Sequence, residues 1–193
     1  MKNSLLIVFA FAVGLSTLMS SCDNNNNTSS PDDKEVKGSI LTNIKIMEDS
    51  LMKMSEDGSN VRNIHKIELI NRFLAYYHAF PADEYSAVCL DRVHMIYSGM
   101  NVHIRAAAYA DTVLMKYPNY TERGVILESL GSIYDIFITP RDTALVRKYY
   151  TQLLEEFPKM DEEKREGIKE RLRNNNLTFD EYLDKKVKEI TAM

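Results

Sequence analysis

One eight-residue pattern occurs twice in this chain. The sequence reads LDRVHMIY over residues 90–97 and LESLGSIY over residues 127–134, which is 37 residues later. An aromatic–proline pair recurs as well, at Phe80-Pro81, Tyr117-Pro118 and Phe157-Pro158, with the prolines 37 and 40 residues apart. Because both markers keep one register, they indicate repeated units of about 40 residues, which is the size of a helix–turn–helix pair that buries its apolar face by stacking.

Helical periodicity runs through the whole chain after its N-terminal region. A first amphipathic helix carries the stripe Ile40, Ile44, Met47, Leu51 and Met54. Further helices are predicted at about 61–80, 83–98, 101–116, 121–137, 144–156, 161–174 and from Thr178 onward. Since no segment alternates with the two-residue period of a strand, the sequence predicts an all-α fold of helices joined by short turns.

For two of these helices the sequence also predicts which residues form the apolar face. The helix at 61–80 has one apolar face, widened so that neighbours should cover it on two sides; the face is Ile64, Ile67, Ile70, Leu74 and Tyr77, and the widening residues are Leu69, Phe73 and Tyr76. The helix after Thr178 opens with the capping-box pattern Thr178 to Glu181. Its apolar face is Phe179, Tyr182, Leu183, Val187 and Ile190.

The repeated unit resembles the tetratricopeptide repeat. The first-helix pattern of that family is matched by Leu127, Leu130, Gly131 and Tyr134, and by Leu90, Val93 and Tyr97 with His94 in place of the glycine. The second-helix pattern is matched by Ala106, Ala110, Val113 and Pro118 in one unit and by Val146, Tyr150, Leu153 and Pro158 in the next. The resemblance implies a short right-handed solenoid of antiparallel helix pairs, with units at about 40–81, 83–118 and 120–158.

The register of the repeat fails after Pro158. Gly167, Glu170 and Arg171 stand where a further unit would place apolar residues. A polar terminal helix stops a solenoid from stacking further. We therefore expect residues 161–193 to form a C-terminal capping pair, in which the helix after Thr178 folds back over the helix at 161–174.

His94 and Cys89 are the two residues of the first repeat that invite a chemical interpretation. His94 is either accommodated by a local shift of the helices or marks a function, and one histidine on a packed helix favours accommodation. Cys89 lies between Val88 and Leu90 in a helical pattern, which is typical of a buried apolar residue. His94 is five residues away and off its helix face, so a catalytic pair is not expected.

The N-terminus resembles a bacterial lipoprotein signal. Lys2 is followed by a largely apolar run over residues 5–18 and by Met19-Ser20-Ser21-Cys22, and residues 23–33 are polar. The resemblance implies removal of residues 1–21, lipidation of Cys22 by groups such as palmitate, a flexible tether over 22–38 and a helical domain over 39–193. The alternatives are an ordinary secretory signal cut elsewhere and an uncleaved anchor.

Charge and motifs limit the classes of function. The chain has 24 Lys and Arg against 28 Asp and Glu, and it lacks the basic tract of nucleic-acid-binding proteins. It contains no HExxH, CxxC, GxSxG, P-loop or GxGxxG motif, and its other histidines show no metal-ligand spacing with His94. We expect no catalytic residue, no metal and no cofactor, and hence not an enzyme.

An interaction module is the remaining class, because stacked helix pairs create a concave groove. By resemblance to the repeat family, the groove residues are Val88, Asp91, Met95, Ser98, Val125, Glu128, Ser132 and Asp135. Three of these are acidic, which favours a polar or basic partner segment, although a solvated groove can carry such charges without a partner.

The expected function is a non-catalytic, lipid-anchored scaffold for a protein or peptide partner in envelope assembly or maintenance. The chain resembles the repeat lipoproteins of outer-membrane barrel assembly and the periplasmic repeat proteins of the Tol-Pal system. This implies the periplasmic face of the outer membrane, with the cell surface as the alternative. The alternative function is a periplasmic binding or accessory protein that acts on peptidoglycan or a small ligand, including an enzyme that no motif marks.

Overall fold

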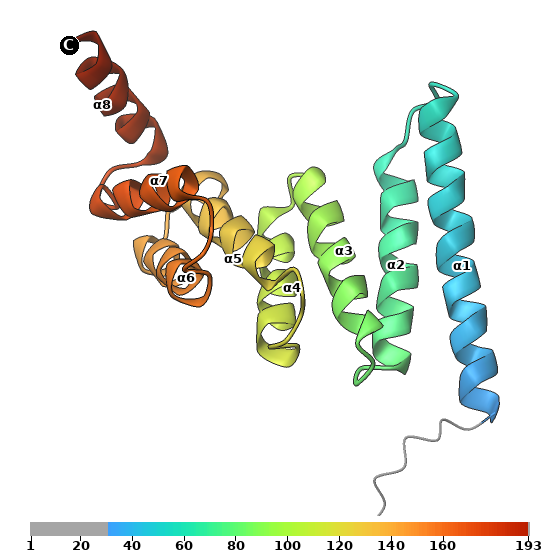
Figure 1. The fold of residues 1–193 in the computed structure, drawn as a ribbon. Coiled ribbons are helices and arrows are strands. Elements are labelled where there is room, and N and C mark those ends of the chain that lie inside the picture. Colours follow the sequence, from blue (N-terminus) through green and yellow to red (C-terminus); the bar gives the residue numbers. More distant parts are fainter. Residues whose placement is uncertain (1–30, 193) are drawn as a thin grey trace, which may run out of the picture.

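Residues 31–192 form an array of helices in the computed structural model, and this described part of the chain contains no strand (Figure 1). The elements are α1 (Pro31–Glu56), α2 (Asn63–Ala79), α3 (Tyr85–Gly99), α4 (His103–Lys116), α5 (Arg123–Ser132), the π-helix η1 (Ile133–Phe137), α6 (Thr143–Glu156), α7 (Glu162–Arg173) and α8 (Phe179–Thr191). The all-α prediction is confirmed. No helix in residues 31–192 is long and apolar enough to cross a membrane. The expected signal segment and Cys22 lie outside the described residues.

The first helix is longer than its apolar stripe. It begins at Pro31, so residues 31–38, which the sequence pattern assigned to a flexible tether, are helical. Asp32 and Asp33 lie in the first turn, where carboxylates interact favourably with the helix dipole. Lys37, in the second turn, forms an ion pair with Asp83 at 2.5 Å, which ties the start of α1 to the segment before α3. The tether prediction was too long because a polar first turn carries no apolar periodicity.

Three helices end in the same way. Phe80, Tyr117 and Phe157 close α2, α4 and α6 with φ of −132°, −127° and −123° and ψ of 59°, 69° and 59°. Each donates its N–H to the carbonyl four residues earlier, and each carbonyl accepts the N–H three residues later. A proline follows each of them and disfavours helical backbone at the preceding residue. The aromatic–proline repeat is therefore a repeated turn.

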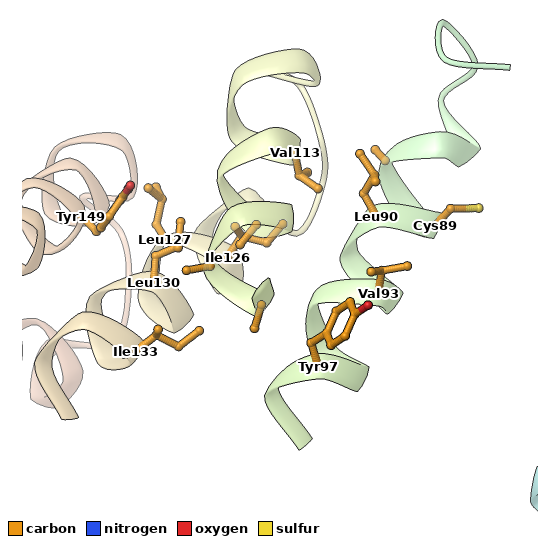
Figure 2. Packing of buried hydrophobic residues seen from close by; sticks show 14 of the residues in the cluster. Cys89, Leu90, Val93, Tyr97, Val113, Ile126, Leu127, Leu130, Ile133 and Tyr149 are labelled. Carbon is orange, nitrogen blue, oxygen red and sulfur yellow. The ribbon is translucent and has the colours of Figure 1, made fainter. Parts of the chain in front are cut away.

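The core is formed between helices that follow one another along the chain. α1 packs on α2, α2 on α3, α3 on α4, and α5 on α6, with α4 joining the two halves through α5. In Figure 2, Leu90 of α3 and Val113 of α4 face each other, whereas Cys89 points to the opposite side of α3. All three side chains are fully buried. The helix pairs α3–α4 and α5–α6 occupy the residue ranges of the two repeats that the sequence pattern defines.

The buried face of α2 differs from the predicted one. Ile64 and Ile67 are exposed, whereas the buried residues are Leu69, Ile70, Phe73 and Tyr76. Both α1 and α3 contact α2, so coverage on two sides is confirmed. Ile70 of the predicted face is buried as expected, and the other core residues of α2 are the three that were expected only to widen the face.

The last helix does not fold back. Figure 1 shows α8 extending away from α7, and none of its side chains is buried. α7 uses its apolar residues, Ile168 and Leu172, against the rest of the array, and its outer surface consists mainly of Glu, Lys and Arg. α7 therefore offers α8 no apolar surface, and the predicted capping pair is wrong in this respect. The capping box is confirmed, since Thr178 and Glu181 exchange hydrogen bonds.

Candidate interaction surface

His94 joins three helices. Its Nδ1 lies 3.0 Å from the carbonyl oxygen of Ala106 on α4, and its Nε2 lies 3.0 Å from Oγ of Ser129 on α5. Because a carbonyl can only accept, Nδ1 carries the proton and donates. Burial of the ring lowers its pKa, which favours the neutral form, so Nε2 accepts from the Ser129 hydroxyl. These two hydrogen bonds fix the position of α5 relative to the α3–α4 pair.

The place of His94 in the repeat is explained by an exchange of side-chain size. In the second unit Gly131 lies under the ring of Tyr150 on α6, and a Cβ at Gly131 would come within 2.4 Å of that ring. The corresponding residues of the first unit are His94 on α3 and Ala110 on α4, both buried. The large and the small residue have changed helices. His94 is thus a buried, hydrogen-bonded residue between packed helices, and the small residue of this pair of positions is on α4.

The predicted groove residues fall into exposed, half-buried and buried sets. Met95 and Val125 are exposed, at 53% and 58%. Met95 directly follows His94 on α3, and Val125 lies one turn before Ser129 on α5, so the His94–Ser129 hydrogen bond joins the two helices that carry these exposed side chains. The half-buried residues are Val88, Asp91, Ser98, Glu128 and Ser132.

The three predicted acidic groove residues are all engaged within the chain. Asp91 accepts a hydrogen bond from the hydroxyl of Tyr120 at 2.9 Å. Glu128 forms an ion pair with Lys164 of α7 at 2.5 Å. Asp135 is buried, at 4% exposure, and cannot form part of a groove surface. The interaction surface therefore has less free negative charge than its sequence suggests.

Asp135 is instead the centre of a buried ion-pair network. Arg171 of α7 binds both of its carboxylate oxygens, at 2.6 and 2.7 Å, and Arg141 donates to Oδ1 at 2.7 Å. Arg141 also donates to the backbone and side-chain oxygens of Asn175. Asp135 lies in η1, which continues α5, so the network attaches the end of the first helix of the second unit to α7 and to the loop before α8. Its role is structural, because the carboxylate has no open side.

A cavity of about 400 Å³ lies between the start of α3 and the turn that joins α4 to α5. Its lining includes Val88, one of the predicted groove residues, and Tyr120, which binds Asp91. Burial and the neighbouring Asp91 carboxylate raise the pKa of Tyr120, so its hydroxyl stays protonated and donates at neutral pH. The cavity thus joins the predicted groove position Val88 to the repeated turn at Tyr117-Pro118.

The thiol of Cys89 has the properties of a core residue. Cys89 is fully buried, and burial raises the pKa of its thiol to about 12, so it is protonated at neutral pH. The prediction of a buried apolar residue is confirmed. Among residues 31–192 no group of three or more His, Cys, Asp or Glu side chains is arranged to hold a metal ion.

Comparison with known proteins gives no relative. No protein-family model, curated protein or solved structure matches the chain. Functional inference therefore depends on the residues and the geometry described above.

Proposed function

We propose that the protein is a non-catalytic scaffold that binds a protein or peptide partner in assembly or maintenance of the bacterial envelope. Its helix pairs are proposed to form a short right-handed solenoid of the tetratricopeptide type. Three identical helix ends, the packing of α3 on α4 and of α5 on α6, and the glycine under an aromatic ring at Gly131 support this assignment.

The observation that carries the proposal is the exposure of Met95 and Val125. Both belong to first helices of their units, and the His94–Ser129 hydrogen bond holds those helices together. Exposed apolar side chains on a rigid surface are a common basis for protein recognition. Because neighbouring helices position them and no long loop does, the surface is preformed for a partner.

The partner chemistry that this surface favours is apolar more than basic. Asp91, Glu128 and Asp135 are already paired with Tyr120, Lys164 and the two arginines, so a basic segment would have to compete with these contacts. A segment that places one or two apolar side chains against Met95 and Val125 meets no such competition. We propose such a segment as the ligand.

The location proposed for the scaffold follows from the N-terminal sequence. Lipid on Cys22 would anchor the helical array to the outer membrane, facing the periplasm, and the cell surface is the alternative location. The N-terminal apolar run, the small residues before Cys22 and the polar residues after it support an anchored protein.

Affinity purification with paired variants tests the proposal. The test variant is Met95→Lys with Val125→Lys, and the matched control is Val36→Lys with Ile46→Lys, which adds the same charge at similarly exposed positions of α1. The wild type and the control should recover the same discrete partner from envelope extracts, and the test variant should lose it. Recovery of no specific partner, or equal recovery by the test variant, would refute the scaffold.

A further inference from the structure

The face of α8 opposite its charged surface is uncovered. Leu183, Val187 and Ile190 are 44%, 59% and 68% exposed and lie on one stripe with Phe179. The stripe spans 12 residues, or about three helical turns. α8 is held to the end of α7 by polar contacts: Lys186 pairs with Glu170 at 2.8 Å, Lys185 donates to Oδ1 of Asn174 at 2.7 Å, and Tyr182 lies against Arg171. Three large aliphatic residues on one uncovered stripe indicate a docking face.

A second uncovered stripe with the same length lies on α4. Ile104 and Met115 are 74% and 75% exposed, and Ala108 between them is also exposed. Between Ala108 and Met115 the same side of α4 carries the half-buried Asp111 and Thr112. Eleven residues separate Ile104 from Met115, so the two side chains lie on the same side of the helix, three turns apart. Within one chain the two stripes are remote, because α5, α6 and α7 lie between α4 and α8 (Figure 1).

The charges beside the two stripes are complementary. Asp180 and Asp184 flank the stripe of α8 on one side, and neither forms an ion pair within residues 31–192. Arg105 and Lys116 flank the stripe of α4 on the corresponding side, and both are exposed. They donate to the hydroxyls of Tyr97 and Tyr77, which are neutral and do not compensate the two positive charges. Corresponding flanks meet when two helices pack antiparallel. In that orientation Phe179 lies near Met115, Ile190 near Ile104, and Asp180 near Lys116.

We propose that α8 of one copy of this protein packs antiparallel on α4 of a second copy, and that both copies exchange α8 in this way. One contact of three turns is small beside the roughly 1,200–2,000 Å² that a stable interface buries, and reciprocal exchange doubles it. The exchange also closes a two-fold dimer. It uses neither Met95 nor Val125, so it does not depend on the proposed scaffold function.

Co-purification of two differently tagged full-length copies tests the dimer. With both copies wild type, the second tag should be recovered with the first, and light scattering in detergent should give the mass of two chains. Val187→Asp in both copies, or Ile104→Asp in both, should lower recovery about tenfold or more, since either places a charge in the contact. Val36→Asp, at an exposed position of α1, is the matched control and should leave recovery unchanged.

Two combinations make the test specific for the α4–α8 contact. A Val187→Asp copy mixed with an Ile104→Asp copy retains one intact contact and should recover more than either variant paired with itself. Lys116→Glu should weaken recovery, and Asp180→Lys added to it should restore recovery. Dimers sensitive to Val187→Asp but insensitive to Ile104→Asp would mean that two α8 helices pair with each other, and would overturn the proposal.

Other results of these experiments would assign the apolar face of α8 to a different binding partner. A single-chain mass at all concentrations would overturn self-association. Binding of that single chain to phosphatidylglycerol–phosphatidylethanolamine vesicles, lost on Val187→Asp in a Cys22→Ala background, would assign α8 to the lipid surface instead. A ladder of masses would mean head-to-tail chains and would overturn the reciprocal form.

Discussion

Gly131 of α5 lies so close to Tyr150 of α6 that a Cβ at this position would be 2.4 Å from the tyrosine ring. Side-chain contacts of this kind set how near two helices approach. In the first unit the bulky residue is His94, on the first helix of the pair, and the small one is Ala110, on the second. The two units therefore solve the same packing problem with opposite assignments of size.

Gly131→Ala should destabilise the protein by about 2–3 kcal/mol, because the added methyl group must displace the Tyr150 ring. Gly167→Ala is the control: nothing lies near that glycine on α7, and the change should stabilise by about 0.5–1 kcal/mol. Urea unfolding measures both. In a Tyr150→Ala background the cost of Gly131→Ala should fall below about 1 kcal/mol, and an undiminished cost would mean that the ring is not the obstacle.

The stability of the protein should depend on His94 at mildly acidic pH. Burial lowers the pKa of His94 in the folded state below the ordinary value of 6.5, so the unfolded chain takes up the proton first as pH falls. The stabilisation that comes from the buried, neutral His94 is complete above pH 6.5. It is lost as pH falls from 6.5 towards the lower pKa of His94 in the folded state.

The comparison that isolates this effect is with His94→Gln, which keeps a donor and an acceptor but does not titrate. Between about pH 7.5 and 5.5 the wild type should lose more unfolding free energy than His94→Gln, by up to about 1.4 kcal/mol per pH unit. Urea titrations followed by circular dichroism supply both curves. Parallel curves would show that His94 does not couple protonation to folding.

Asp135→Asn should cost about 3–5 kcal/mol, because it leaves the guanidinium groups of Arg171 and Arg141 without their shared carboxylate. The matched control is Glu128→Gln, which also breaks an ion pair between the second unit and α7. The side chains of Glu128 and Lys164 are 40% and 42% exposed, so this change should cost less than about 1 kcal/mol. Equal costs in chemical denaturation would contradict the structural role of the buried network.

Lipidation gives a prediction about the N-terminal region. Radiolabelled palmitate should be incorporated into the wild type and into Cys89→Ala, and it should be lost in Cys22→Ala, because Cys22 follows the apolar run and Cys89 is buried in the core. Labelling that survives Cys22→Ala would exclude the lipoprotein signal.

Local patterns predicted the helices and turns well. The aromatic–proline pairs at Phe80, Tyr117 and Phe157 mark three helix ends of the same geometry, and the Thr178–Glu181 capping box is formed. Both features depend on backbone preferences of a few adjacent residues, so the sequence alone contains the information. The burial of Cys89 also follows from its immediate neighbours.

Tertiary relationships were harder to predict. Asp135 has the spacing of a groove residue, yet Arg141 and Arg171 bury it, and Arg171 is 36 residues away. The apolar face of α8 predicts an amphipathic helix. The residues of α8 do not reveal that α7 lacks an apolar surface on which this face could pack. The pairing of Asp91 with Tyr120 likewise depends on how the turn between α4 and α5 is placed. Residues at equivalent positions of the two repeats can therefore differ in burial and in their interaction partners.

The most direct test of the scaffold is site-specific photo-crosslinking in living cells. A photoreactive amino acid at Met95, and separately at Val125, should give the same discrete adduct with another protein, whereas one at Val36 should not give it. A shared adduct is predicted because the proposed partner binds across α3 and α5, the two helices that the His94–Ser129 hydrogen bond joins. If neither position gives an adduct beyond that seen at Val36, the surface of α3 and α5 does not bind a partner, and the central claim is contradicted.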